Sequence, residues 1–150
     1  MSKKTVIFLV ILILAPVIIY FLWPSDESRI RKLFREGAKA IEQEKIDEVM
    51  SRVSFNYTDE RGLSYLTVKE GMARVFQQMS GIKIEHEIKN ITVKDSSATA
   101  DLDIRVIASR GQETGYAVGD AAEPAHIKFY LEKERAKWLV SKTEGMPLLF

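Results

Sequence analysis

The sequence predicts an α+β domain that follows a single membrane-spanning helix. Three observations support this: an apolar run over Thr5–Trp23, helical periodicity in three segments between residues 25 and 81, and two-residue alternation beyond them. Helices first and strands after them are typical of α+β domains. We therefore expect an anchor over residues 1–24 and one domain over residues 25–150, in which a curved antiparallel sheet wraps around three helices.

The apolar run has the length of a transmembrane helix. It contains no Asp, Glu, Lys or Arg between Thr5 and Trp23, and at 1.5 Å per residue it spans roughly 28 Å, the thickness of a bilayer core. The apolar part of a secretory signal is shorter, about 7–15 residues, and ends in a small-residue cleavage pattern that is missing before Pro24. We expect residues 5–23 to remain in the lipid bilayer, with a cleaved signal or a buried helix as the alternatives.

Basic residues on both sides of the run bear on its orientation. Two lysines precede the run, whereas a group of basic residues follows it within a predicted helix: Arg29, Arg31, Lys32 and Arg35. A plain count would place the later group in the cytoplasm. Because that group belongs to a folded helix and not to a free loop, we expect a single-pass protein with a cytoplasmic N-terminus. The domain then lies outside, in the periplasm or the extracellular space.

Composition argues against several function classes. The chain has 22 Lys and Arg against 21 Asp and Glu, and two of the lysines precede the anchor. The domain therefore lacks the basic surplus of a nucleic-acid binder, and we expect no nucleic-acid partner. The chain has no cysteine, which excludes disulfides, thiolate metal sites and thiol nucleophiles.

Three helices are predicted between residues 25 and 81. Ser25 is placed to cap the first, whose apolar stripe comprises Ile30, Leu33, Phe34, Gly37, Ala38 and Ile41. A short second helix covers residues 45–53. Thr67 and Glu70 form a capping box for the third helix, which ends at Gly81.

The remaining segments read as strands and turns. Residues 54–66 predict a short hairpin whose tip is Asp59–Gly62. Alternation then predicts a strand from residue 82 with a bulge where its phase shifts at Asn90. Later strands are expected over residues 98–108 and 125–132 and around Trp138, with a loop over residues 110–123.

This order of elements resembles the nuclear transport factor 2-like superfamily, also described as SnoaL-like or cystatin-like cones. The resemblance covers about residues 25–145. It is carried by the amphipathic first helix, the segment Phe55–Gly62, the capped third helix, the strand Ile82–Ile88, the strand that begins at Ala98 and the terminal strand with Trp138. It implies a sheet that curls around an interior pocket. The superfamily includes isomerases, dehydratases, adaptors and assembly components of secretion machinery, so the fold does not select a function.

Three residues are the pocket candidates: Tyr57, His86 and Trp138. His86 falls on the apolar face of its strand, where a histidine serves as an acid or base or simply packs in the core. The resemblance implies that isomerases of the superfamily use an aspartate base with a tyrosine, which points to Asp59 beside Tyr57. Asp59 equally suits a turn, so we assign no catalytic residue.

No metal or cofactor is expected. Asp101, Asp103 and Glu132 share the polar face of the predicted sheet, where ion pairs with Arg105 or Lys128 account for them. The two histidines of the chain lie on opposite predicted faces, which argues against a shared zinc site.

Two functions agree best with these observations. The first is a membrane-anchored, non-catalytic module that acts through an unidentified protein partner or as a homodimer. The second is a cone that binds or converts a small apolar molecule, with Tyr57 and His86 lining its pocket. An assembly component of a secretion system is a third reading. A filled interior would favour the first, and a continuous cavity that holds Tyr57 and His86 would favour the second.

Overall fold

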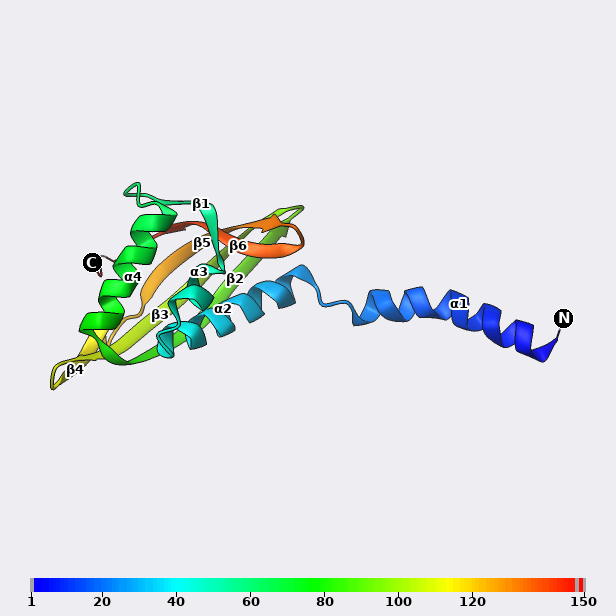
Figure 1. The fold of residues 1–150 in the computed structure, drawn as a ribbon, viewed down its shortest axis with the longest axis horizontal. Helices are drawn as coiled ribbons and strands as arrows, with labels where there is room; N and C mark the ends of the chain where they lie inside the picture. Colours follow the sequence, from blue (N-terminus) through cyan, green and yellow to red (C-terminus); the bar gives the residue numbers. More distant parts are fainter. Residues whose placement is uncertain (1, 148, 150) are drawn as a thin grey trace.

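A curved sheet forms the body of the domain, and helices cover one of its faces (Figure 1). The computed structural model describes residues 2–147 and 149; residues 1, 148 and 150, at the ends of the two predicted ranges, lie outside it. The elements of the described residues are α1 (Lys3–Leu22), α2 (Asp26–Glu42), α3 (Ile46–Met50), β1 (Val53–Asp59), α4 (Tyr65–Gln78), β2 (Ser80–Lys94), β3 (Ser97–Arg110), β4 (Glu113–Val118), β5 (Ala125–Glu134) and β6 (Lys137–Glu144).

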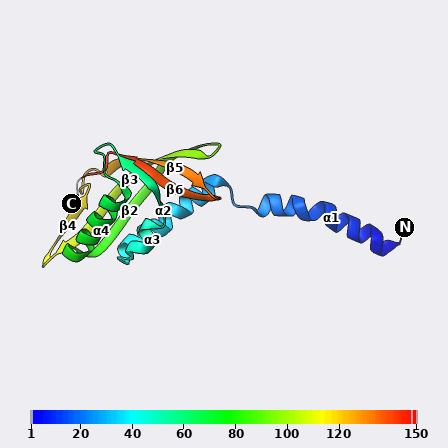
Figure 2. The same cartoon turned by 45° about the horizontal axis from the view of Figure 1, so that its top comes forward.

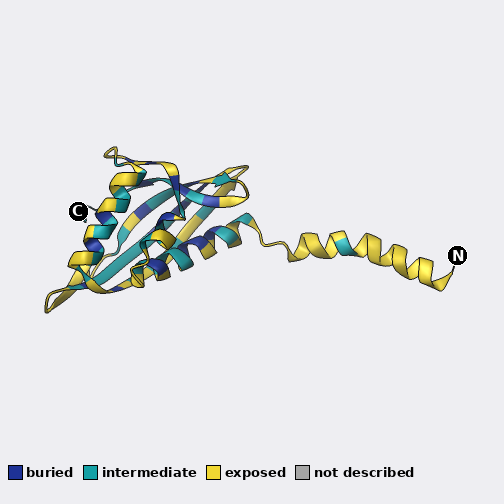
Figure 3. Ribbon diagram, viewed as in Figure 1, coloured by how far each residue is buried: buried dark blue, intermediate teal, exposed yellow. Residues whose placement is uncertain are grey.

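Helix α1 extends away from the rest of the chain (Figure 1). None of its side chains is buried, and Figure 3 shows the helix in the exposed colour except for one intermediate segment at Ala15. Its length and composition are sufficient to cross a membrane, and it lies near the N-terminus. These features fit a membrane anchor or a signal sequence.

Helix α2 is the predicted amphipathic helix. The Ser25 hydroxyl accepts a hydrogen bond from the Ser28 N–H at 3.1 Å, which confirms the predicted cap. The buried face of the helix carries Ile30, Leu33 and Phe34, and the Phe34 ring meets Phe129 of β5 edge to face with centroids 4.9 Å apart. Helix α2 therefore packs onto the concave face of the sheet.

The sheet is mixed, with strand order β1-β6-β5-β3-β2 and with β4 paired to the end of β3. Strands β1 and β6 run parallel, and the other pairs are antiparallel. The bulge expected near Asn90 is present, since the pairing of β2 with β3 shifts register between Ile88 and Asn90. Figure 2 shows the bend of the sheet around α2, α3 and α4.

The predicted hairpin over residues 54–66 does not form. A single bridge, Thr58 to Ser64, is all that pairs there, and β1 instead lies parallel to β6. The Asp59 carboxylate accepts hydrogen bonds from the Arg61 N–H at 2.9 Å and the Leu63 N–H at 2.8 Å. These bonds close a tight turn that leads the chain straight into α4.

Helix α4 begins earlier than predicted. Its N-cap is Ser64, whose hydroxyl accepts from the Thr67 N–H at 3.4 Å, so Thr67 lies inside the first turn and does not cap the helix. Both residues are good caps, and the turn closed by Asp59 selects the earlier one. Helix α3 is also shorter than predicted and covers Ile46–Met50.

The predicted loop over residues 110–123 contains a further strand. β4 turns back at Gly111, which has a φ of 63°, and pairs with the end of β3. The Ser109 and Thr114 hydroxyls share a hydrogen bond of 2.7 Å across this pair. Glycines and short side chains weaken the alternation that normally indicates a strand, which is why the sequence reads as a loop.

Candidate ligand-binding cavity

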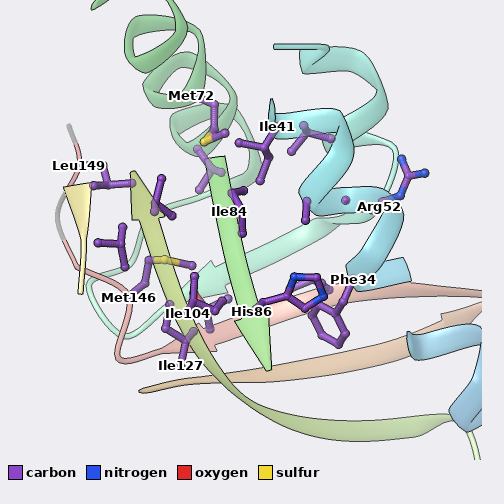
Figure 4. Close-up of a pocket in the computed structure, with 18 of the residues that line it drawn as sticks. Phe34, Ile41, Arg52, Met72, Ile84, His86, Ile104, Ile127, Met146 and Leu149 are labelled. Atoms are coloured by element: carbon purple, nitrogen blue, oxygen red, sulfur yellow. The ribbon is translucent and has the colours of Figure 1, made fainter. Parts of the chain in front are cut away.

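An apolar cavity of about 240 Å³ lies between the sheet and helices α2, α3 and α4. Strands β2, β3, β5 and β6 form one wall through alternate inward side chains such as Ile84, Leu102 and Phe129. Two hydrophobic clusters border it: one includes Leu33, Phe34 and Leu102, and the other includes Val75, Ile82 and Ala108. The interior of the cone is therefore not filled (Figure 4).

Methionines form an unusual share of this lining. The chain has five methionines, and four of them line the cavity: Met50, Met72, Met79 and Met146. A methionine side chain is unbranched and polarizable, so it adapts to apolar surfaces of different shape. The lining suits a ligand that is mostly apolar. An engineered apolar cavity of about 150 Å³ holds benzene, so this larger cavity has room for a somewhat bigger molecule.

Tyr57 brings a hydroxyl to the cavity wall. Its side chain is 9% exposed, and its hydroxyl shares a hydrogen bond of 2.6 Å with that of Thr143 on β6. Burial raises the pKa of the Tyr57 hydroxyl, and the bond with Thr143 offsets this only in part. The phenol therefore stays protonated at neutral pH.

His86 lines the same cavity from β2. In Figure 4 its imidazole lies beside the Phe34 ring. No hydrogen bond joins this imidazole to another of the described residues, and the side chain is half-buried. His86 therefore offers ring nitrogens to a ligand. Tyr57 and His86, both pocket candidates from the sequence, line one cavity.

Arg52 is the charged side chain among the described lining residues. Its Nη2 lies 3.1 Å from the Glu36 Oε2, and its Nη1 donates to the Glu48 carbonyl oxygen. The hydrogen bond from Arg52 holds the pKa of the Glu36 carboxyl below its ordinary value. The Arg52 charge is thus neutralised within the helical layer of the fold.

Asp59 has a structural role. The sequence alone allowed either a catalytic base or a turn residue at this position. Burial raises the pKa of its carboxyl, but hydrogen bonds from the Leu63 N–H and from Arg61 outweigh this and hold the pKa below its ordinary value. The Arg61 Nη2 lies 2.8 Å from the Asp59 Oδ2. Asp59 does not belong to the described cavity lining, so its carboxylate organises the turn before α4.

Trp138 also lies outside the described cavity lining. It is 5% exposed, and its indole N–H donates to the Asp26 Oδ1 at 3.0 Å. The Lys133 ammonium lies 2.9 Å from the same oxygen. Trp138 therefore fastens the start of α2 to the hairpin of β5 and β6.

The polar face of the sheet carries ion pairs, although with partners other than those predicted. The Asp103 carboxylate bonds to the His126 Nδ1 and lies 3.6 Å from the Lys89 ammonium. Arg105 donates to the Asp120 carbonyl oxygen at 2.8 Å. His126 is 76% exposed. It pairs with Asp103, whereas His86 pairs with the next residue, Ile104, so the two histidines lie on opposite faces of the sheet. Within the described residues no group of three or more His, Asp or Glu could hold a metal ion.

Sequence reasoning missed Thr143 and the cavity-lining role of the methionines. Thr143 is buried because β6 carries a bulge: Val140 pairs with Leu131, but Lys142 pairs with Tyr130. Plain alternation from Trp138 and Val140 would turn Thr143 outward. Met72 and Met79 lie on the apolar face predicted for α4, but a helical stripe does not distinguish a filled core from a cavity wall.

Neither a known protein family nor a curated protein matches the sequence. Solved structures do match the fold. A putative scytalone dehydratase from Novosphingobium aromaticivorans has a TM-score of 0.64 at 11% identity, over 80% of this chain and 87% of that one. A ketosteroid isomerase-like protein from Erwinia carotovora atroseptica has a TM-score of 0.62 at 13% identity, over 81% and 95%.

A third structure is similar at slightly higher identity. A domain of unknown function with a cystatin-like fold from Nostoc punctiforme has a TM-score of 0.62 at 20% identity, over 83% of this chain and 79% of that one. Likeness at this level shows the fold alone. The domain has the nuclear transport factor 2-like cone fold, which confirms the predicted fold class.

Proposed function

We propose that this protein is a membrane-tethered receptor for a small, largely apolar molecule. The observation that carries the proposal is the apolar cavity of about 240 Å³ that contains both Tyr57 and His86. Helix α1 supports the tether by its length and composition. In this account α1 stays in the bilayer, the N-terminus is cytoplasmic, and the cone lies outside.

The polar groups of the cavity favour binding over catalysis. The Tyr57 and Thr143 hydroxyls bond to each other, and Arg52 is held by Glu36. The described lining contains no carboxylate to serve as the base of an isomerase or dehydratase. His86 remains as the group that orients a ligand through one hydrogen bond, while the apolar wall supplies the affinity.

The proposal predicts that the protein purifies with a bound molecule. Full-length protein is solubilised in mild detergent and purified, and its organic extract is analysed by mass spectrometry. Ala38 lines the cavity from α2, so Ala38→Phe places a ring in the ligand space. The matched control is Ala73→Phe on α4, which is also partly exposed but lies outside the described lining.

The wild type and Ala73→Phe should each yield the same apolar compound in near-equimolar amount, and Ala38→Phe should lose most of it. Equal amounts of that compound in the two variants would mean that it travels with the detergent and not in the cavity. That result would overturn the proposal.

An exposed apolar surface favours a second candidate, a protein-interaction module. Phe55 is 81% exposed and Leu66 is 67% exposed, and the Phe55 ring lies 4.8 Å from that of Tyr65. Exposed clusters of this kind commonly mark partner contacts. If this function is correct, Phe55→Ser with Leu66→Ser should abolish co-purification of a partner or a second copy and leave the bound compound unchanged.

A further inference from the structure

Two hairpin turns lie side by side at the end of the domain that faces α1 (Figure 1). The first joins β2 to β3 over residues 94–97, and the second joins β5 to β6 over residues 134–137. The Lys133 N–H donates to the Ser96 carbonyl oxygen at 2.8 Å, so the two turns are held together. We call their basic residues, Lys94, Arg135 and Lys137, the turn surface.

The junction between α1 and the domain is short, and side-chain contacts hold it against the domain. Helix α1 ends at Leu22 and α2 begins at Asp26, which leaves three residues between them. The Arg29 guanidinium lies 5.6 Å from the centre of the Trp23 ring and donates to the Ala136 carbonyl oxygen at 3.4 Å. These contacts keep the turn surface close to the end of α1.

The turn surface is exposed and positively charged. Lys94, Arg135 and Lys137 are all exposed, and none of them forms an ion pair within 4.0 Å among the described residues. Of the two acids in these turns, Glu134 accepts from the Ser54 hydroxyl at 3.0 Å and so is engaged inward. Asp95 is the one acid left exposed in the turns.

Arg135 occupies a backbone position that favours another residue. It has a φ of 47°, and Ala136 after it has a φ of 66°. A two-residue hairpin of this geometry is formed at lower cost by Asn or Gly. A basic side chain is therefore present at the tip despite the local backbone preference, which points to a role for its charge.

We propose that the turn surface rests on the headgroups of anionic lipids beside the chain's own membrane helix. This inference rests on the tether of the proposed function. Each Lys or Arg near an anionic bilayer favours contact by roughly fivefold, and three together are enough to orient a domain whose end is already held at the membrane. Contact with lipid would fix the direction in which the cone projects.

The full chain contains no cysteine, so a single spin label can be placed without other changes. One label is attached at Ser96→Cys in the first turn, and another at Gln112→Cys, in the exposed turn between β3 and β4 at the opposite end of the domain. Both proteins are placed in nanodiscs of phosphatidylcholine, alone or mixed with phosphatidylglycerol, that carry a paramagnetic headgroup chelate. The relaxation enhancement of each label reports its closeness to the headgroups.

The inference predicts that phosphatidylglycerol increases the enhancement at Ser96 by about twofold or more and leaves Gln112 unchanged. High salt should remove the increase, because exposed charges are screened. Equal enhancement at Ser96 in both lipid mixtures would overturn the inference while leaving the tether intact. Failure of the chain to enter nanodiscs would overturn the tether and, with it, this inference.

Charge variants separate docking from folding. Lys94→Gln, Arg135→Asn and Lys137→Gln together should abolish the lipid-dependent increase, and Asn at residue 135 suits the turn. The matched control, Arg74→Gln with Lys83→Gln and Arg110→Gln, removes the same number of charges from exposed residues elsewhere on the domain and should retain the increase. A loss of equal size in both variants would show a general charge effect and would contradict the inference.

Discussion

At two glycines the same added methyl group has opposite effects. Gly37 lies inside α2, where a Cβ would come 3.5 Å from the Arg52 Cδ, an ordinary contact. Gly145 has a φ of 80°, and a Cβ there would lie 2.5 Å from the His126 carbonyl oxygen. Gly37 therefore lowers the stability of α2, whereas Gly145 is required by the backbone conformation after β6.

We therefore predict that Gly37→Ala raises the free energy of unfolding by about 0.5–1 kcal/mol. Gly145→Ala should lower it by about 1–3 kcal/mol, because the left-handed backbone and the carbonyl contact are both unfavourable for alanine. Urea unfolding of the full chain in detergent, followed by circular dichroism, measures both changes. Destabilisation of similar size by the two substitutions would contradict this account.

At the scale of elements, Asp26 joins α2 to the hairpin of β5 and β6. Hydrogen bonds from Lys133 and Trp138 hold the pKa of the Asp26 carboxyl below its ordinary value of 3.8. A carboxyl whose pKa is lowered in the folded state contributes stability that is complete above its unfolded pKa. That contribution is lost as the pH falls through the folded pKa.

Asp26→Ala should lower the free energy of unfolding at neutral pH by about 1–2 kcal/mol, since it leaves two buried or half-buried donors without an acceptor. The difference from wild type should shrink as the pH falls below 3.8. Glu27→Ala is the control, because Glu27 pairs with Arg31 on the surface and should cost less than about 0.5 kcal/mol. A pH-independent difference would rule out the charged bonds as its cause.

The elements also show which features of the fold can be predicted from sequence patterns. Periodicity predicted α2, its cap at Ser25 and the long strands β2 and β3, because each exposes one face and buries the other. It could not predict that β1 pairs with β6, since alternation reports burial and not the pairing partner. The turn at Asp59 and the strand β4 depend on local hydrogen bonds that leave little periodic trace.

For the candidate site, the sequence predicted the apolar face of His86 and named Tyr57 as a pocket candidate, but it did not predict the space between them. Whether inward side chains meet or leave a cavity depends on the curvature of the whole sheet and on the bulges in β2 and β6. Trp138 illustrates the same limit: the sequence made it a pocket candidate, yet it is 5% exposed, bonds to Asp26 and lies outside the described cavity lining.

At the scale of the whole molecule, the tether makes a direct prediction. The full chain should stay with membranes after alkaline carbonate extraction, and a reporter fused after Phe150 should be active on the outer side. An uncleaved anchor of α1 composition is retained by its apolar length. A freely soluble product that begins near Ser25, or a reporter active only in the cytoplasm, would contradict the tether or its orientation.

The occupancy of the cavity is the central claim, and its own methionines can report it. Carbon-13 methyl spectra of the full chain in nanodiscs are recorded during a titration with 1-naphthol, a small neutral ring system with one hydroxyl. The account predicts saturable shifts of the methyl signals of Met50, Met72, Met79 and Met146, which line the cavity, with loss of these shifts in Ala38→Phe and retention in Ala73→Phe. Shifts that grow linearly without saturation, or that are the same in the two variants, would contradict it.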